Sequence, residues 1–187
     1  MWPMSLLLGG LLATSATPLG TVRAYFEALA RGDADGALAL VDEPSEADRL
    51  VVEASAASEG GLRRLEELVR DRFGERVGLG VAERHRQWMQ ALEKAKVEVH
   101  ADRAVVRPEG ERPVRLRHVN GAWKVESPAE RISRAERNAL ELALRKTEEA
   151  TKDLAARIRS GACKSARDAR EALRKALGGN EQEGTPL

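Results

Sequence analysis

The chain has 187 residues, of which 42% are hydrophobic and 33% are charged, and it carries a formal net charge of +1. This length fits one domain with appendages, and the composition predicts a soluble, helix-rich protein. The small net charge excludes a general attraction to nucleic acid or anionic lipid. The lone cysteine, Cys163, excludes an intramolecular disulfide.

Residues 1–16 include a short apolar run, SLLLGGLLATSA, which ends at Ala16. A transmembrane helix needs about 20 apolar residues, so this run predicts no transmembrane span. Its length and the small residues Thr14 and Ala16 before Thr17 are typical of a secretory signal peptide, although no Lys or Arg precedes the run. We therefore expect an exported protein of the periplasm or cell envelope. If the segment is instead a buried helix, the protein is cytoplasmic.

The next residues predict two short helices. Thr17 and Pro18 are typical of the start of a helix, and Gly32 of its end. Asp33 then caps a second helix whose apolar side includes Leu38.

Three more helices are expected before the sheet. Ser45 and Asp48 have capping-box spacing, and we expect the helix that they start to break at Gly60-Gly61. Apolar residues spaced by three and four predict a further helix over 62–73, and a glycine-containing loop follows. The last of the three is predicted over 82–94, with Trp88 on its apolar side.

The period then changes to alternation of apolar and polar residues, which predicts β-strands. The expected strands span 96–101, 103–107, 112–119 and 122–126. Asn120-Gly121 between two alternating runs predicts a hairpin with a type I′ turn.

A long helix is predicted to begin at Ser127-Pro128-Ala129-Glu130 and to change register near Ser160-Gly161. Its thin apolar stripe favours packing on its own domain, and a coiled coil is the alternative. Residues 178–187 are polar and aperiodic, so we expect a disordered tail. The predicted organisation is a signal peptide over 1–16, an α+β domain over 17–127 and a helical extension over 128–177.

Two segments carry a resemblance to a known family. The segment VRAYFEALARGDADGALALV resembles the opening helix pair of the nuclear transport factor two-like superfamily, and VEVHADRAVVRPEGERPVRLRHVNGAWKVES is similar to its closing meander. The resemblance covers about residues 18–127 and implies a curved antiparallel sheet wrapped around helices as a cone, often with an internal pocket. The stretch between the two segments departs from the family, because it reads as almost wholly helical. The sheet is therefore expected to have three to four strands.

The hairpin at Asn120-Gly121 gives the candidate site. Alternation of side chains places Leu116, His118 and Trp123 on one apolar face of the sheet, which we expect to be the core or pocket face. Tyr25 is a further candidate from the first helix. His118 is a candidate general base, but an inert core or edge histidine is the simpler interpretation, because no carboxylate can be placed opposite it. The three histidines and Cys163 lack metal-ligand spacing, so no metal and no cofactor is predicted.

The sequence contains no phosphate-binding loop, nucleophile elbow or zinc-protease helix, and it does not predict an enzyme. The leading hypothesis is a non-catalytic exported accessory domain that binds a small apolar molecule or a protein partner. One alternative is an enzyme of the ketosteroid isomerase or polyketide cyclase kind that uses His118. The other is an assembly protein that oligomerises, for example as a homodimer, through the C-terminal helix. No nucleic-acid partner is expected.

Overall fold

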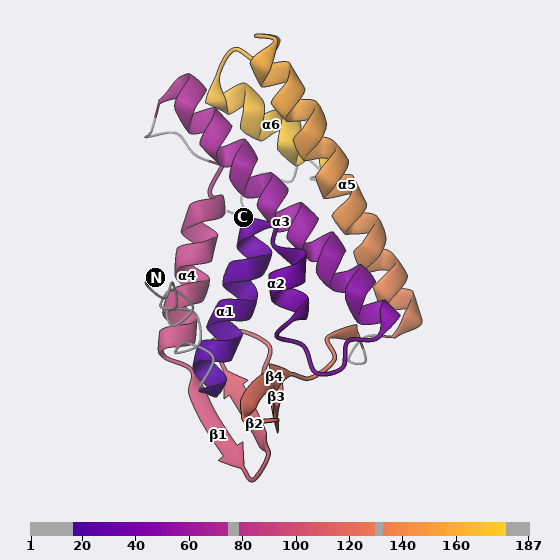
Figure 1. The fold of residues 1–187 in the computed structure, drawn as a ribbon. Coiled ribbons are helices and arrows are strands. Elements are labelled where there is room, and N and C mark those ends of the chain that lie inside the picture. The colour runs from indigo at the N-terminus through magenta and orange to yellow at the C-terminus, as the bar shows by residue number, and fades with distance from the viewer. Residues whose placement is uncertain (1–16, 75–78, 130–132, 179–187) are drawn as a thin grey trace, which may run out of the picture.

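A computed structural model describes residues 17–74, 79–129 and 133–178. In these ranges, helices pack against a four-stranded antiparallel sheet, and a long helix and a short last helix follow the sheet (Figure 1). The predicted α+β class is therefore confirmed. The predicted leader 1–16 lies outside the described residues, as does the predicted tail beyond Gly178.

The first two helices, α1 (Pro18–Arg31) and α2 (Ala34–Leu38), form where the sequence predicts them. The Gly20 N–H donates to Thr17 Oγ1 at 3.1 Å, and the Gly36 N–H donates to Asp33 Oδ1 at 2.9 Å. Gly32 ends α1 with a φ of 76°, a left-handed conformation that glycine adopts at little cost.

One continuous helix, α3 (Glu46–Phe73), replaces the two helices expected on either side of Gly60-Gly61. The predicted break is wrong because both glycines lie at points where another segment approaches α3. A Cβ atom at Gly60 would lie 2.7 Å from the Cα of Gly32, and one at Gly61 would lie 3.0 Å from Oγ1 of Thr151. Each glycine lowers the helix propensity by about 1 kcal/mol, but in return it permits close packing.

The four strands form a meander in the order β1-β2-β3-β4. Their bounds are close to the predicted ranges: β1 (Lys96–His100), β2 (Arg103–Arg107), β3 (Val114–Val119) and β4 (Ala122–Val125). Asn120 and Gly121 have φ angles of 50° and 82°, and two successive positive values are those of the predicted type I′ turn.

The outer edge of β4 is closed by the segment after α2. The Asp42 N–H donates to the Val125 carbonyl at 2.9 Å, and the Val125 N–H donates to the Leu40 carbonyl at 2.7 Å. This short parallel bridge ties the helical half of the domain to the end of the sheet.

One face of the sheet carries the main core, as the alternation predicts. Leu116 and Trp123 are buried on this face, whereas Arg115 and Arg117 are exposed on the other. Helix α1 lies over β2 and β4 on the core face. The next helix to pack beside α1 and α3 is α4 (Val81–Glu93), which follows the predicted range 82–94 (Figure 1).

The long C-terminal helix, α5 (Arg134–Arg159), begins after Ser133 and not after Ser127 as predicted. The Ser127 hydroxyl donates to Asp48 Oδ1 at 2.7 Å. A capping box formed by Ser133 and Glu136 starts α5 instead. Residues 130–132, which belong to the predicted helix, lie outside the described ranges.

Helix α5 packs along α3. The sequence predicts a change of register near Ser160-Gly161 within one long helix, whereas the structure has a break there, after which α6 (Ala166–Ala176) begins. These three helices bury a second apolar cluster, which consists of Leu65, Val69, Leu154, Ile158, Cys163, Ala166 and Ala169. Leu154 and Ile158 belong to the predicted apolar stripe, so that stripe is used for packing within the chain.

The buried carboxylate of Asp48 joins the start of α3 to the chain that leaves β4. Its Oδ2 accepts hydrogen bonds from the Ser45 N–H at 3.0 Å and the Ser45 hydroxyl at 2.6 Å. Its Oδ1 accepts from the Ser127 hydroxyl at 2.7 Å and the Ala129 N–H at 3.0 Å. Burial alone would raise the pKa of Asp48, but these hydrogen bonds outweigh it and hold the pKa below its usual value.

Candidate functional site

A hollow of about 790 Å³ opens where α1, α3 and α4 meet the connection between β2 and β3. Its main apolar lining is buried or half-buried and consists of Phe26, Leu29, Leu62, Val81 and Trp88. Its rim is polar and includes Glu59, Arg84, His85, Glu109 and Glu111. We call this hollow the aromatic groove.

The aromatic groove owes its character to Phe26 of α1 and Trp88 of α4. The two ring centroids lie 4.1 Å apart with an angle of 43° between the ring planes. Both rings are half-buried. Tyr25 packs edge-on against Phe26 from the core side, with centroids 5.2 Å apart and planes at 87°.

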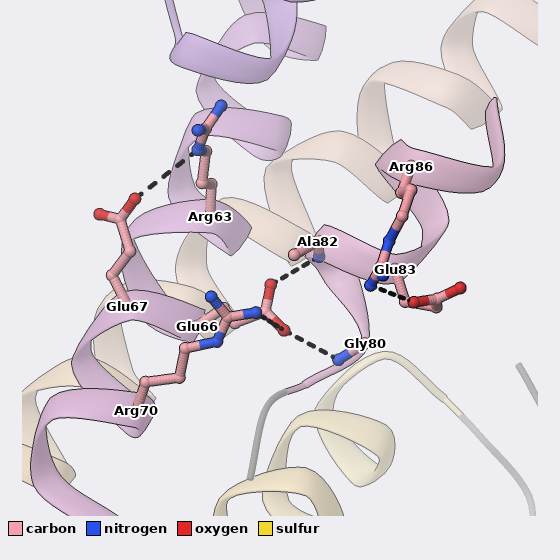
Figure 2. Close-up of polar contacts among 8 residues, drawn as sticks. All are labelled: Arg63, Glu66, Glu67, Arg70, Gly80, Ala82, Glu83 and Arg86. Carbon is pink, nitrogen blue, oxygen red and sulfur yellow. Dashed lines mark hydrogen bonds and ion pairs between the residues drawn. The ribbon is translucent and has the colours of Figure 1, made fainter. Parts of the chain in front are cut away.

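A smaller hollow of about 130 Å³ adjoins the aromatic groove and shares Ala30, Glu59, Val81 and His85 with it. It is bordered by Glu66, a nearly buried carboxylate of α3. Figure 2 shows the Glu66 side chain reaching from α3 to the first residues of α4. Its two oxygens accept from the Gly80 N–H at 3.1 Å and the Ala82 N–H at 2.6 Å.

Glu66 supplies α4 with the N-terminal cap that its own sequence lacks. The residue before α4 is Gly80, which has no side chain to accept from the first turn. A carboxylate beside free N–H groups is also favourable for the helix dipole. Arg70 lies 3.7 Å from Glu66 and balances its charge. Glu66 therefore fixes the start of α4 against α3, and with it one wall of the groove.

The other charges drawn in Figure 2 lie on the surface. Arg63 pairs with Glu67 at 3.6 Å, and Arg86 pairs with Glu83 within the first turns of α4. Such exposed pairs contribute little to stability.

Glu59 and His85 line both hollows, but within the described ranges neither has a hydrogen bond or ion pair to an acid–base partner. Both oxygens of Glu66 are already occupied by backbone N–H groups. The described residues also bring no group of three or more His, Cys, Asp or Glu side chains together in a way that could hold a metal ion.

The site residues predicted from the sequence lie elsewhere, in and beside the main core. Tyr25, Leu116 and Trp123 belong to one buried cluster. His118 has the predicted strand register opposite Trp123, and the two ring centroids lie 4.9 Å apart. Its side chain is exposed, however, because it sits at the turn end of the hairpin, beyond the cover of α1. The role of these residues in a pocket stays a prediction.

Among the site residues predicted from the sequence, Tyr25 has a shifted pKa. Burial of the phenol, and then the nearby Asp48 carboxylate, raise its pKa to about 12. The neutral phenol is therefore strongly favoured in the folded protein.

The sequence predicts Trp88 on the apolar side of a helix, but it identifies neither Phe26 nor Trp88 as part of a site. The apolar periodicity predicts which face of each helix is apolar, but the contact between the Phe26 and Trp88 rings appears only when α1 packs against α4. His85 is half-buried and lines both hollows, although the sequence presents it only as one of three histidines without metal-ligand spacing. The sequence gives no direct indication that Glu66 caps α4. The only hint is that Gly80, the residue before α4, has no side chain that could serve as a cap.

None of the described helices is long and apolar enough to cross a membrane. No family model, curated protein or solved structure matches this chain.

Proposed function

We propose that this protein is a non-catalytic binding domain that takes a small apolar molecule into the aromatic groove. The observation that carries this proposal is the half-buried Phe26–Trp88 pair in the lining of a hollow of about 790 Å³. Small-molecule sites are typically concave, of roughly 300–1,000 Å³, with apolar and aromatic walls and a few polar groups. The groove has each of these properties.

The distribution of polarity supports a small ligand over a large protein partner. Leu29 and Leu62 are buried in the lining, whereas the charged residues stand at the rim. A ligand that enters the hollow covers the two rings, and the rim charges remain in water. Burial of one aromatic side chain by a ligand can contribute about 1.5–3 kcal/mol to the free energy of binding.

We further infer that the domain is a divergent relative of the nuclear transport factor two-like superfamily. The helix pair α1–α2 and the four-stranded meander follow each other in the order that the resemblance implies, and this order supports the inference. A crystal structure in which the helix pair did not pack on the meander would contradict this relationship.

Export remains part of the proposal and rests on the sequence of residues 1–16. Native mass spectrometry of the full chain recovered from a cell-envelope fraction would test it. We expect a chain that starts near Thr17. An uncut chain confined to the cytoplasm would rule export out.

The binding site can be tested with N-phenyl-1-naphthylamine, a neutral apolar dye that fluoresces when it leaves water. We expect the dye to bind the wild-type protein and to quench tryptophan fluorescence. Trp88→Ala removes one ring of the lining and should weaken dye binding about tenfold or more. Ala30→Trp, which fills the hollow from α1, should weaken binding to a similar extent.

Trp123→Phe is the matched control, because this ring belongs to the buried core away from the groove lining. The control should bind the dye as the wild type does. If Trp88→Ala and Ala30→Trp fold normally and both keep wild-type affinity, the aromatic groove is not the binding site.

A further inference from the structure

Strand β1 is a free edge of the sheet within the described ranges. The opposite edge, at β4, is closed by Leu40 and Asp42, whereas β1 pairs with β2 on one side only. Every second residue of an edge strand points its N–H and C=O groups away from the sheet. Strand β1 therefore presents a row of backbone groups that can pair with another strand.

The apolar face of the sheet continues to this edge, where it is partly exposed. Val97 is opposite Val106, and Val99 is opposite Ala104, so both valines share the core face. Val106 and Ala104 are buried, yet Val97 is 40% exposed and Val99 is 51% exposed. An edge of this kind is usually protected, because it invites pairing.

The charges of β1 are arranged in a self-complementary way. Lys96 and Glu98 flank Val97 and lie together on the opposite face from it. When two copies of β1 run antiparallel about a two-fold axis at Val97, each Lys96 comes opposite Glu98 of the other copy. The same arrangement brings the two Val97 side chains together on the helix side.

We propose that β1 pairs in this register with β1 of a second copy, so that the two sheets form one continuous sheet. An isologous contact of this kind is the common way to build a homodimer. The dimer surface is separate from the aromatic groove. The dimer proposal therefore does not depend on the proposed ligand binding.

Two neighbouring registers are less favourable. An axis at Glu98 sets the two Glu98 carboxylates opposite each other, and like charges in that position destabilise a sheet. An axis at Val99 gives Glu98 a histidine, His100, as partner and not the permanent cation that Lys96 supplies. The register at Val97 is the one that satisfies both permanent charges of β1.

A charge swap tests the pairing. Glu98→Lys opposes two lysines at each end of the contact and should raise the dimer dissociation constant about tenfold in sedimentation-velocity runs over a concentration series. The double variant Lys96→Glu/Glu98→Lys restores two opposite-charge pairs and should regain the wild-type constant. Both variants lose the intramolecular Glu98–Arg107 pair at 3.3 Å, so the loss of that pair does not account for a difference between them.

A double variant that dimerises no better than Glu98→Lys would overturn the proposal. A wild-type chain that stays monomeric at every concentration would overturn it too.

Disulfide trapping tests the register directly, in a Cys163→Ala background. Val97→Cys should form a disulfide-linked dimer under mild oxidation, because the two thiols face each other. Val99→Cys should not, since the two Val99 positions are then roughly 13 Å apart along the strands. Leu142→Cys, at a residue of α5 that is 56% exposed, measures random collision. Equal trapping at Leu142, or faster trapping at Val99, would refute the register at Val97.

Discussion

Removal of the Asp48 carboxylate should destabilise the fold far more than loss of an ordinary helix cap. Asp48→Ala deletes the acceptor of four hydrogen bonds. Two of the donors are backbone N–H groups, those of Ser45 and Ala129, which cannot turn away. Asp48 itself is 0% exposed and Ala129 is 2% exposed, so water does not readily replace the carboxylate.

The magnitude follows from these contacts. Loss of the cap at the start of α3 costs about 1 kcal/mol. A buried N–H left without an acceptor, here that of Ala129, costs roughly 1–3 kcal/mol more. We therefore expect Asp48→Ala to lower the free energy of unfolding by about 3 kcal/mol, which is a large fraction of the 5–15 kcal/mol typical of a domain.

Equilibrium urea unfolding at neutral pH, followed by circular dichroism, measures this loss. Glu136→Ala is the matched control, because Ser133 and Glu136 form the same kind of capping box at α5 but the carboxylate is exposed and bonds only locally. The control should lose much less stability. Equal losses in the two variants would show that the bonds from Asp48 to Ser127 and Ala129 contribute nothing to stability.

The Asp48 carboxylate should make the free energy of unfolding depend on pH in the acid range. Because the pKa of Asp48 is lower in the folded chain, its contribution is complete above the unfolded-state value of about 3.9. That contribution is lost as the pH falls through the lower native pKa. The wild type should therefore lose more stability in this acid range than Asp48→Ala does, and parallel pH profiles would contradict the assignment.

Two further predictions concern buried contacts of α1 and α3. Gly60→Ala should lower the free energy of unfolding by about 1–3 kcal/mol, because the new Cβ would lie 2.7 Å from the Gly32 backbone. Gly61→Ala should cost less, because its Cβ meets a side-chain oxygen. Urea unfolding compares the two variants, and a Gly60→Ala protein as stable as the wild type would refute this close approach. Tyr25 is the one tyrosine of the chain, so phenolate absorbance should titrate near pH 12 in the folded protein. Its contribution to stability should be complete below about pH 10 and lost as the pH rises towards 12, and a folded midpoint near 10 would contradict the burial.

Much of the fold was predictable because its signals are local. Thr17, Asp33 and Ser45 cap helices where the sequence predicts them, since an N-cap depends on residues within one turn. Asn120-Gly121 sets the register of β3 with β4 for the same reason. The alternation from Val114 to Val125 then identifies the buried face of the sheet without further information.

The wrong predictions share a different physical cause, which is contact between distant segments. Gly60-Gly61 has the composition of a break, but Gly32 and Thr151 approach it and keep the helix continuous. Ser127 has the pattern of a helix cap, but α5 begins after Ser133, and the Ser127 hydroxyl donates to Asp48, which lies far back in the sequence. The aromatic groove was missed for the same reason, because it exists only where α1, α3 and α4 meet.

The path of α3 through the molecule bears on how this chain can be divided. Over its 28 residues the helix extends about 42 Å. Its first half supplies Val52 and Ala56 to the main core, and its second half supplies Leu65 and Val69 to the cluster under α5 and α6. The boundary after residue 127 therefore marks a change in secondary structure, but the side-chain packing continues across it. Recombination or gene fusion at that boundary would separate α5 and α6 from the surface of α3 on which they pack, so the two parts are expected to be inherited as one unit.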